Sequence, residues 1–417
     1  MTAAFSGGID LFATLLQESW IQKTLAFALL VGSIMELLER GGGISGFVSF
    51  VVERRSWVRS PRAALLVSYI IGILIFIESS ITALIAGAVG RPLCDRYGIS
   101  RAKLAYVCDA TAAPTSSLIA LNGWGALLLG LIATQQEAGY IEGDSLSWLL
   151  ESLGYNFYAM SALLVAFVVI WFNIEIGPMR HASMRPTSAM LSGIKPPPHA
   201  SAFFMVAPIF FMVASLFFFL YRTGNGNILA GSGSTSLFYT MLATLLFIYM
   251  TYIPTKKLDT KSYFIASFVG AKKLFGIALI LLFAFALGKL TLSMHTGSYL
   301  ASLVQADLPP LFLPALIFLL SGVMAFATGT SWGTFSIMIP VAVPMAVGVD
   351  ANVALAMGAV ISGGVFGDHC SPISDTTIIA ALASECEVVE HVNTQLPYAL
   401  LGGFIALLLF ILFASVS

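Results

Sequence analysis

Two aspartates lie close together in an otherwise apolar part of this chain, within the segment Phe366-Gly-Asp-His-Cys-Ser-Pro-Ile-Ser-Asp-Thr-Thr-Ile-Ile-Ala380. An ionisable side chain in the bilayer interior costs ~3 kcal/mol or more, so Asp368 and Asp375 need a ligand or a partner there. Pro372 and the neighbouring hydroxyl residues predict a helix that is broken within the membrane. Broken helices of this kind form binding sites at the middle of membranes. The segment therefore predicts a site for a small ion or solute.

The overall composition is that of a membrane protein with several spans. Of the 417 residues, 58% are apolar and 10% are charged, and the mean hydropathy is +0.92. These values exclude a set of soluble domains and predict an all-α, polytopic fold. The four cysteines have no paired spacing that would indicate a disulfide or a zinc site. We therefore expect membrane lipid around the chain, no cofactor and no nucleic-acid partner.

Apolar runs divide the chain into spanning helices and interrupted elements. Six runs have the ~20 residues needed to cross a bilayer: Trp20–Leu38, Asn156–Ile176, Phe203–Tyr221, Thr235–Ile253, Leu274–Met294 and Pro397–Ser415. Two longer tracts are predicted to be broken helices: 102–134, with its break at Asp109–Ser117, and 353–383, with its break around Pro372. Two others are predicted to be re-entrant hairpins: 63–90, turning at Glu78–Thr82, and 311–347, turning at Thr328–Thr334.

The basic residues lie almost entirely on one side of this layout. The loops 39–62, 91–103, 177–202 and 254–273 hold 17 of the 20 Lys and Arg. An excess of Lys and Arg in loops marks the cytoplasmic side of a membrane. The loop 135–155, on the other side, has acidic residues and no Lys or Arg. The charge pattern thus predicts a multi-pass protein with those four loops inside the cell. We expect it in a bacterial cytoplasmic (inner) membrane.

The same order of elements occurs twice along the chain. A single helix, a hairpin, a broken helix and another single helix make up residues 20–176 and again residues 274–415, with linking scaffold helices and basic loops at 177–273. The two copies run in opposite directions, because their first helices start on opposite sides. A weak echo between Ser116-Ser-Leu-Ile-Ala120 and Thr376-Thr-Ile-Ile-Ala380 supports the pairing. Inverted repeats with paired broken helices are typical of alternating-access carriers.

Three motifs resemble the NhaC family of sodium/proton antiporters. They are Phe366–Ala380, Thr328-Gly-Thr-Ser-Trp-Gly-Thr334, and the run Arg91-Pro-Leu…Asp95-Arg…Ile99-Ser-Arg-Ala-Lys-Leu-Ala-Tyr106…Asp109…Thr111-Ala-Ala-Pro114. The similarity covers roughly residues 20–415. It implies the fold of the ion-transporter superfamily, in which a transport domain moves like an elevator against a scaffold. It also implies exchange of sodium for protons.

The chain departs from this family in two places. Relatives often carry Asp-Asp-x-x-Asn at the tip of the first hairpin, where this chain has Glu78-Ser-Ser-Ile-Thr82. This change leaves open which solute is coupled. Nothing equivalent to the helices 203–253 precedes Trp20. We therefore expect a homodimer, in which a second copy covers the scaffold surface that such helices would cover.

Oxygen ligands suited to sodium are concentrated in the two broken helices. Sodium is a hard cation that binds carboxylates, hydroxyls and backbone carbonyls. A carboxylate in low dielectric favours its neutral form, so it can exchange a proton for sodium. The expected sodium-binding set is Asp368, Asp375, Asp109, Ser371, Ser374, Thr111 and Ser116, with Asp368, Asp109 and His369 as proton-coupling candidates. The alternative is that the aspartates cap helix fragments or pair with Lys and Arg, and that the histidine is held by a hydrogen bond.

The two hairpin tips carry further candidate ligands for an ion or a substrate. They are Glu78, Ser79, Ser80 and Thr82 at the first tip and Thr330, Ser331 and Thr334 at the second. The same hydroxyls could serve only as caps of the returning half-helices. Helix N-termini also attract anions, so the tips suit a carboxylate substrate as well.

Other functions fit the sequence less well. An intramembrane aspartyl protease would need Gly-x-Gly-Asp, and Val365 stands where the first glycine is required. None of the five histidines begins an HExxH zinc motif, so we expect no enzyme. A channel does not need paired inverted elements. The expected function is sodium/proton antiport by alternating access, and the open alternative is sodium- or proton-coupled transport of a small carboxylate or amino acid.

Overall fold

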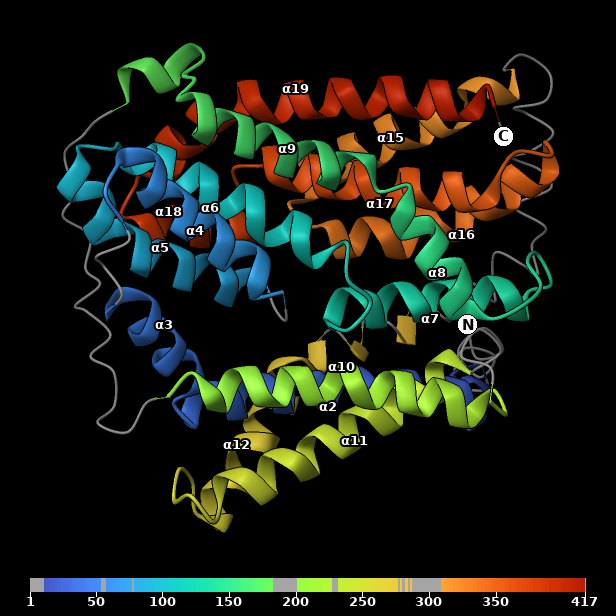
Figure 1. The fold of residues 1–417 in the computed structure, drawn as a ribbon. Coiled ribbons are helices and arrows are strands. Elements are labelled where there is room, and N and C mark those ends of the chain that lie inside the picture. Colours follow the sequence, from blue (N-terminus) through green and yellow to red (C-terminus); the bar gives the residue numbers. More distant parts are fainter. Residues whose placement is uncertain are drawn as a thin grey trace, which may run out of the picture.

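The computed structural model describes residues 11–53, 58–76, 79–182, 201–226, 232–276, 278–279, 282–283, 286 and 309–416. Helices account for the regular structure of these residues, and no strand occurs among them (Figure 1). Eight of the described helices are long and apolar enough to cross a membrane. The expected all-α, multi-pass fold is thus confirmed. The candidate ligand Glu78 and most of the expected helix Leu274–Met294 lie outside the described residues.

The helices form two layers (Figure 1). The smaller layer contains α2 (Ser19–Arg40), α3 (Gly43–Glu53), α10 (Phe203–Thr223), α11 (Gly233–Tyr252) and α12 (Thr260–Lys273). The larger layer contains α4 (Pro61–Leu74), α5 (Ser79–Tyr97), α6 (Arg101–Ser116), α7 (Gly123–Glu137), α8 (Ser145–Gly154), α9 (Phe157–Phe172), α15 (Leu313–Thr328), α16 (Ser331–Gly348), α17 (Val353–Cys370), α18 (Asp375–Ser384) and α19 (Val388–Ala414). The layers meet where α2 packs against α7 and α11 packs against α8.

Each pair of helices that the sequence predicts as a hairpin packs together, α4 with α5 and α15 with α16. The turn between α15 and α16 is set by two adjacent residues. Gly329 has a φ of +65°, which glycine adopts without strain, and it caps the C-terminus of α15. The hydroxyl of Thr330 then accepts the backbone N–H of Gly333 and caps the N-terminus of α16.

The first interrupted tract breaks later than the sequence indicates. The break was expected at Asp109–Ser117, but α6 continues through Pro114 to Ser116, and α7 begins at Gly123. Asn122 explains this position, because its Oδ1 accepts the backbone N–H of Gly125 while its Nδ2 donates to the carbonyl of Ser116 (2.8 Å). The side chain that fixes the break therefore follows the proline. Asp109 consequently lies within a continuous helix.

The second interrupted tract breaks between Cys370 and Asp375, where α17 ends and α18 begins. Ser371 fixes this break, because its hydroxyl donates to the carbonyl of Phe326 on α15 (2.8 Å). Further along the same crossing, α17 and α15 approach with backbone in contact. A Cβ at Gly367 would lie 2.0 Å from the carbonyl oxygen of Gly322. Only glycine fits at this crossing.

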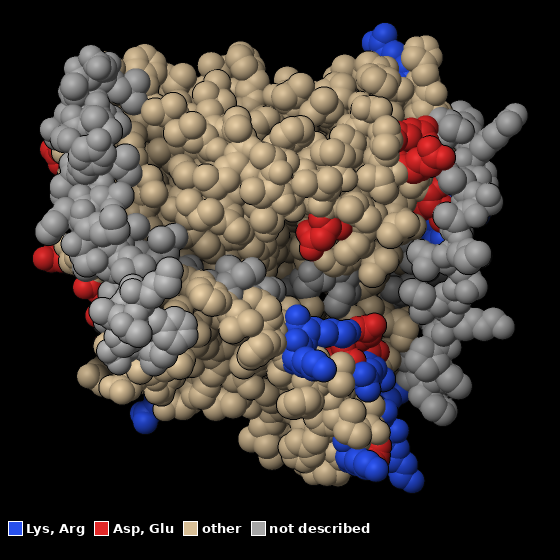
Figure 2. Space-filling model, turned by 180° about the vertical axis from the view of Figure 1, so that it is seen from behind, with Lys and Arg blue, Asp and Glu red and all other residues tan. Residues whose placement is uncertain are grey.

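Basic side chains lie mostly at one end of the molecule (Figure 2). The α5–α6 connection, the 3-10 helix Gly177–His181 and the α11–α12 connection lie together at the left of Figure 1, whereas α8 and the C-terminus lie at the right. In the reverse view, Lys and Arg gather mainly at the corresponding end, and a broad face carries few charges (Figure 2). An uncharged face of this breadth suits contact with lipid.

Candidate functional site

Asp368 lies in the last turn of α17, directly before the break, and its side chain is 2% exposed. Its Oδ2 accepts a hydrogen bond from the hydroxyl of Thr376 at the start of α18 (3.4 Å). The hydroxyls of Ser374, in the break, and Ser331, at the N-terminus of α16, also interact with this carboxyl group. Its Oδ1 has no hydrogen-bond partner among the described residues. Asp368 thus presents one free oxygen in a pocket of hydroxyl groups.

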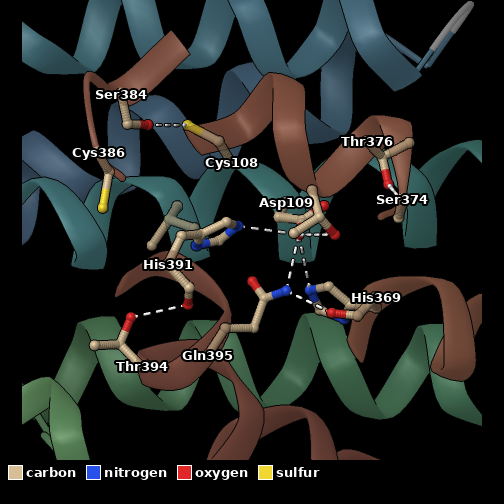
Figure 3. Close-up of polar contacts among 12 residues, drawn as sticks. Cys108, Asp109, His369, Ser374, Thr376, Ser384, Cys386, His391, Thr394 and Gln395 are labelled. Carbon is tan, nitrogen blue, oxygen red and sulfur yellow. Dashed lines mark hydrogen bonds and ion pairs between the residues drawn. The ribbon is translucent and has the colours of Figure 1, made fainter. Parts of the chain in front are cut away.

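Asp109 lies near the middle of α6 and is fully buried. Its Oδ2 accepts hydrogen bonds from Gln395 Nε2 (2.8 Å) and Thr377 Oγ1 (3.1 Å), and it lies 3.2 Å from His391 Nε2. Its Oδ1, like that of Asp368, has no partner among the described residues. Figure 3 shows Gln395 and His391 converging on Asp109 from α19.

His369 follows Asp368 in the chain, and its imidazole lies near Asp109. Its Nε2 is 3.9 Å from Asp109 Oδ2, and its Nδ1 is 2.7 Å from the hydroxyl of Tyr158 on α9. Gln395 Nε2 donates to the backbone carbonyl of His369 (2.6 Å) as well as to Asp109. One amide group therefore ties the middle of α6 to the end of α17, next to Asp368 (Figure 3).

Both hairpin tips lie against the helix breaks. Near the first tip, the carbonyl of Phe76 accepts a hydrogen bond from Asn122 (2.9 Å). At the second tip, a Cβ at Gly329 would lie 2.7 Å from Ile373. The indole of Trp332 in the second tip packs edge-on against Trp124, just after the first break (5.8 Å between ring centroids). Elements from both halves of the chain thus meet in one region.

The other expected ligands of the broken helices have different surroundings. Thr111 donates to the carbonyl of Val107 (2.8 Å), and its hydroxyl lies against Gly72 of α4, not toward Asp109. Ser116 is fully buried, and its hydroxyl has no partner among the described residues. Asp375 is exposed, and its Oδ1 accepts the backbone N–H of Thr376 (2.9 Å). Of these three residues, Ser116 alone keeps a buried, unused oxygen.

The hydroxyls of the hairpin tips act partly as caps. Thr82 is fully buried and donates to the carbonyl of Ile75 at the end of α4. Ser79 is buried and Ser80 is half-buried at the start of α5. Thr334 donates to the carbonyl of Thr330 (3.0 Å) within α16. Ser331, at the second tip, contacts the carboxyl group of Asp368.

Five residues beside the two carboxylates were missed by the sequence reasoning. They are Tyr158, Thr376, Thr377, His391 and Gln395. His391 and Gln395 are four residues apart in a helix whose later part is apolar, so they share one helix face. That spacing was the signal that could have found them. Tyr158 gives no such signal, because its partner comes from a distant helix.

The arrangement can bind a hard cation and a proton. It offers two buried carboxylates, each with an unused oxygen, together with neighbouring hydroxyls and the ends of broken helices. Two buried imidazoles adjoin one of the carboxylates. A helical membrane fold with paired hairpins and broken helices around such groups defines a secondary transporter.

Comparisons with known proteins give the family. A model of the Na+/H+ antiporter family matches residues 122–415, so the chain belongs to this family. An uncharacterized protein of Haemophilus influenzae is 33% identical over 397 residues, which cover 89% of this chain and 75% of that protein. The malate-2H(+)/Na(+)-lactate antiporter of Bacillus subtilis is 36% identical over 102 residues, which cover 24% of this chain and 22% of that protein.

Solved structures share the fold at low sequence identity. The YdaH transporter of Alcanivorax borkumensis has a TM-score of 0.63 and 15% identity, over 99% of this chain and 88% of that one. MtrF of Neisseria gonorrhoeae, from a class of antimetabolite efflux pumps, has a TM-score of 0.65 and 15% identity, over 99% and 84% of the two chains. The expectation of a transporter that is not an enzyme is confirmed.

Proposed function

We propose that this protein exchanges sodium for protons across the membrane by alternating access, with Asp368 as the exchanging group. The observation that carries the proposal is the surroundings of Asp368: a buried carboxylate at a helix break, facing hydroxyls, with one oxygen unpartnered. A carboxylate in that position binds either a proton or a hard cation. It does not bind both, because both neutralise the same charge.

The exchange needs one bond change. Sodium enters as the O–H bond of protonated Asp368 breaks, and the proton leaves to water on the open side. Hydroxyls of Ser331, Ser374 and Thr376, together with backbone oxygens of the break, are the proposed additional sodium ligands. Asp109 is proposed as a second anionic group of the site. The hydroxyl oxygen of Ser116 is proposed as a ligand at the edge of the site. The exposed Asp375 is proposed to attract sodium to the break.

The movement is proposed to be of the elevator type, with the hairpins and broken helices of the inverted repeats in the moving part. In this arrangement the layer of α2, α10, α11 and α12 serves as the scaffold, and the larger layer carries the site past it. Two copies of the scaffold layer are proposed to form a homodimer in a bacterial cytoplasmic membrane. The exposed apolar side chains of α10 and α11, such as Phe210 and Met250, suit either lipid or a second copy.

A second candidate function is the coupled transport of a small carboxylate or amino acid. Two helix N-termini, those of α16 and α18, begin at Ser331 and Asp375, beside the Asp368 pocket. Their N–H groups favour an anionic group. The malate–lactate exchanger of Bacillus subtilis and an arginine/ornithine antiporter of Halobacterium salinarum each match over 24% of this chain.

Proton flux in proteoliposomes distinguishes the two functions. The purified full chain is reconstituted with a pH dye inside, and a sodium gradient is imposed with no organic solute present. Antiport predicts immediate proton movement that sodium drives and potassium does not. Proton movement that begins only after malate, lactate or arginine is added would overturn sodium/proton antiport in favour of the second candidate.

A further inference from the structure

Asp109 is surrounded differently from Asp368. Its Oδ2 is contacted by three groups within hydrogen-bonding distance: the amide of Gln395, the hydroxyl of Thr377 and Nε2 of His391. Several donors on one carboxylate oxygen favour the ionised form. Among the described residues, the groups in contact with the Asp368 carboxyl group are hydroxyls, those of Thr376 (3.4 Å to Oδ2), Ser374 and Ser331, and none of them is an imidazole or an amide. The two aspartates are therefore suited to different states, Asp109 to a permanent negative charge and Asp368 to a changing one.

No lysine or arginine within the described ranges forms an ion pair with Asp109. The two basic residues of the same helix are engaged elsewhere, Arg101 with Asp95 and Glu385 and Lys103 with Glu175. A buried carboxylate without a countercharge is strongly unfavourable. The groups that can supply a positive charge beside it are the imidazoles of His391 (3.2 Å) and His369 (3.9 Å). Both are buried.

We propose that Asp109, His369 and His391 form a second proton site, which keeps one proton throughout the transport cycle. This inference rests on the proposed function, in which Asp368 exchanges a proton for sodium. The retained proton neutralises Asp109, and Gln395 is the positioning residue that holds the Asp109 carboxylate and the His369 carbonyl together (2.8 and 2.6 Å). In this account His391 shares the retained proton, and Gln395 positions the groups that hold it.

The burial pattern explains why this proton stays. Asp368 is 2% exposed, but it adjoins a break whose residues Pro372 and Ile373 are exposed. His391, Gln395 and Thr377 are each fully buried. The proton on Asp368 thus lies beside a break with exposed residues, whereas the retained proton lies among fully buried side chains.

Other titratable groups surround the second proton site. Tyr158 of α9 contacts His369 Nδ1 at 2.7 Å, and Asp368 and Asp375 belong to the adjacent broken helix. The thiols nearby are Cys108, which accepts from Ser384 (3.9 Å), and Cys370. None of these groups brings a positive charge. The retained proton therefore remains with the imidazoles and Asp109.

The charge balance has a measurable consequence. With the retained proton, the centre is neutral when Asp368 is protonated and again when ionised Asp368 holds one sodium ion. A neutral centre crosses the low-dielectric region at the smallest cost in both directions. Exchange is then one proton for one sodium ion, and its rate in proteoliposomes does not respond to an imposed potassium-diffusion potential. A voltage-dependent rate would show that the second proton is also exchanged.

Charge compensation among variants tests the role of the imidazoles. The double variant His369→Gln, His391→Gln leaves Asp109 without a countercharge, and its turnover should fall by at least ~10-fold. Adding Asp109→Asn removes the charge that needed compensation, so turnover at saturating sodium should rise at least ~3-fold above that of the double variant. The apparent sodium affinity should stay below that of the wild type, because Asp109 is also a proposed anionic group of the site. Failure of this third substitution to restore turnover, in variants with wild-type melting temperatures, would overturn the proposal.

A spectroscopic measurement keeps the proposal testable when no transport is seen. Nitrogen-15 NMR of the histidine-labelled full chain, with His369 and His391 assigned from the single glutamine variants, reports protonation directly. One imidazolium is expected in this pair in sodium and in potassium alike. Two neutral imidazoles, or loss of the imidazolium on adding sodium, would overturn the second proton site. Absence of sodium-driven proton flux with the imidazolium present would overturn only the proposed function.

Discussion

The substitution Gly367→Ala should weaken the packing that holds the second broken helix in place. A Cβ at this position would lie 2.0 Å from the carbonyl oxygen of Gly322 and 2.7 Å from the backbone nitrogen of Phe326. Favourable contacts of a carbon atom begin near 3.5 Å, so α17 and α15 would have to separate by about 1.5 Å. The obstructing atoms are backbone and cannot rotate away.

The size of the effect follows from two opposing contributions. Overpacking of this kind costs ~3 kcal/mol, at the upper end of the usual range, because neither helix can yield without moving as a whole. Alanine gains ~1 kcal/mol over glycine in a helix interior. A net loss of ~2 kcal/mol in the free energy of unfolding is expected. Because Asp368 is the next residue, the shift of α17 should also lower transport.

The assay is thermal unfolding in detergent, followed by the loss of the monodisperse peak in fluorescence-detected gel filtration. A matched control is Gly154→Ala at the end of α8, where a Cβ would meet nothing within 4 Å. The control should melt at or above the wild-type temperature, and Gly367→Ala should melt clearly below it. Equal melting temperatures for the two variants would refute the reasoning about the α15–α17 crossing.

Three further predictions concern charged groups. Asp375→Asn should lower the rate of sodium-driven proton flux at low sodium less than Asp368→Asn does, because the carboxylate of Asp375 is exposed. An equal loss of rate in the two variants would contradict a role for Asp375 at the edge of the site. Glu385→Gln should cost about 1–3 kcal/mol of stability by thermal melting, because it removes the carboxylate that pairs with the half-buried Arg91 and with Arg101, which then keeps only Asp95 as an ion-pair partner among the described residues. An unchanged melting temperature would contradict this. A cysteine in place of Arg59, in an expected cytoplasmic loop, should resist a membrane-impermeant thiol reagent in intact cells. A cysteine in place of Glu142, in an expected outside loop, should react with it. The reverse result would overturn the topology.

Much of the fold could be predicted from the sequence, because composition and charge act over long stretches. The apolar runs predicted a helical, multi-pass protein. Pro372 and its hydroxyl neighbours predicted the break that lies between α17 and α18. The break after α6 was misjudged, because Pro114 and the serines around it indicated an interruption that Asn122 actually fixes. A proline within a helix removes one backbone hydrogen bond, and α6 accommodates this at Pro114 and continues to Ser116.

The site was only partly predictable, because its polar contacts join distant helices. Asp109 and Asp368 stood out as isolated charges in apolar tracts, and the structure buries both with a free oxygen. Thr111 was expected beside Asp109, but helical geometry turns its hydroxyl toward α4. His391 and Gln395 reach Asp109 across a sequence separation of more than 280 residues. Their spacing shows that the two side chains share one face of α19, but it does not show that this face packs against α6.

The most direct test of the account is the pH dependence of sodium affinity in reconstituted wild type and Asp368→Asn. In the wild type, raising the pH should tighten the apparent affinity for sodium, because the carboxylate must lose its proton before it binds the cation. Asp368→Asn keeps the size of the side chain and removes its charge. The variant should keep the wild-type gel-filtration profile and lose both sodium-driven proton movement and the pH dependence. Normal exchange by Asp368→Asn with an unchanged pH profile would contradict the account.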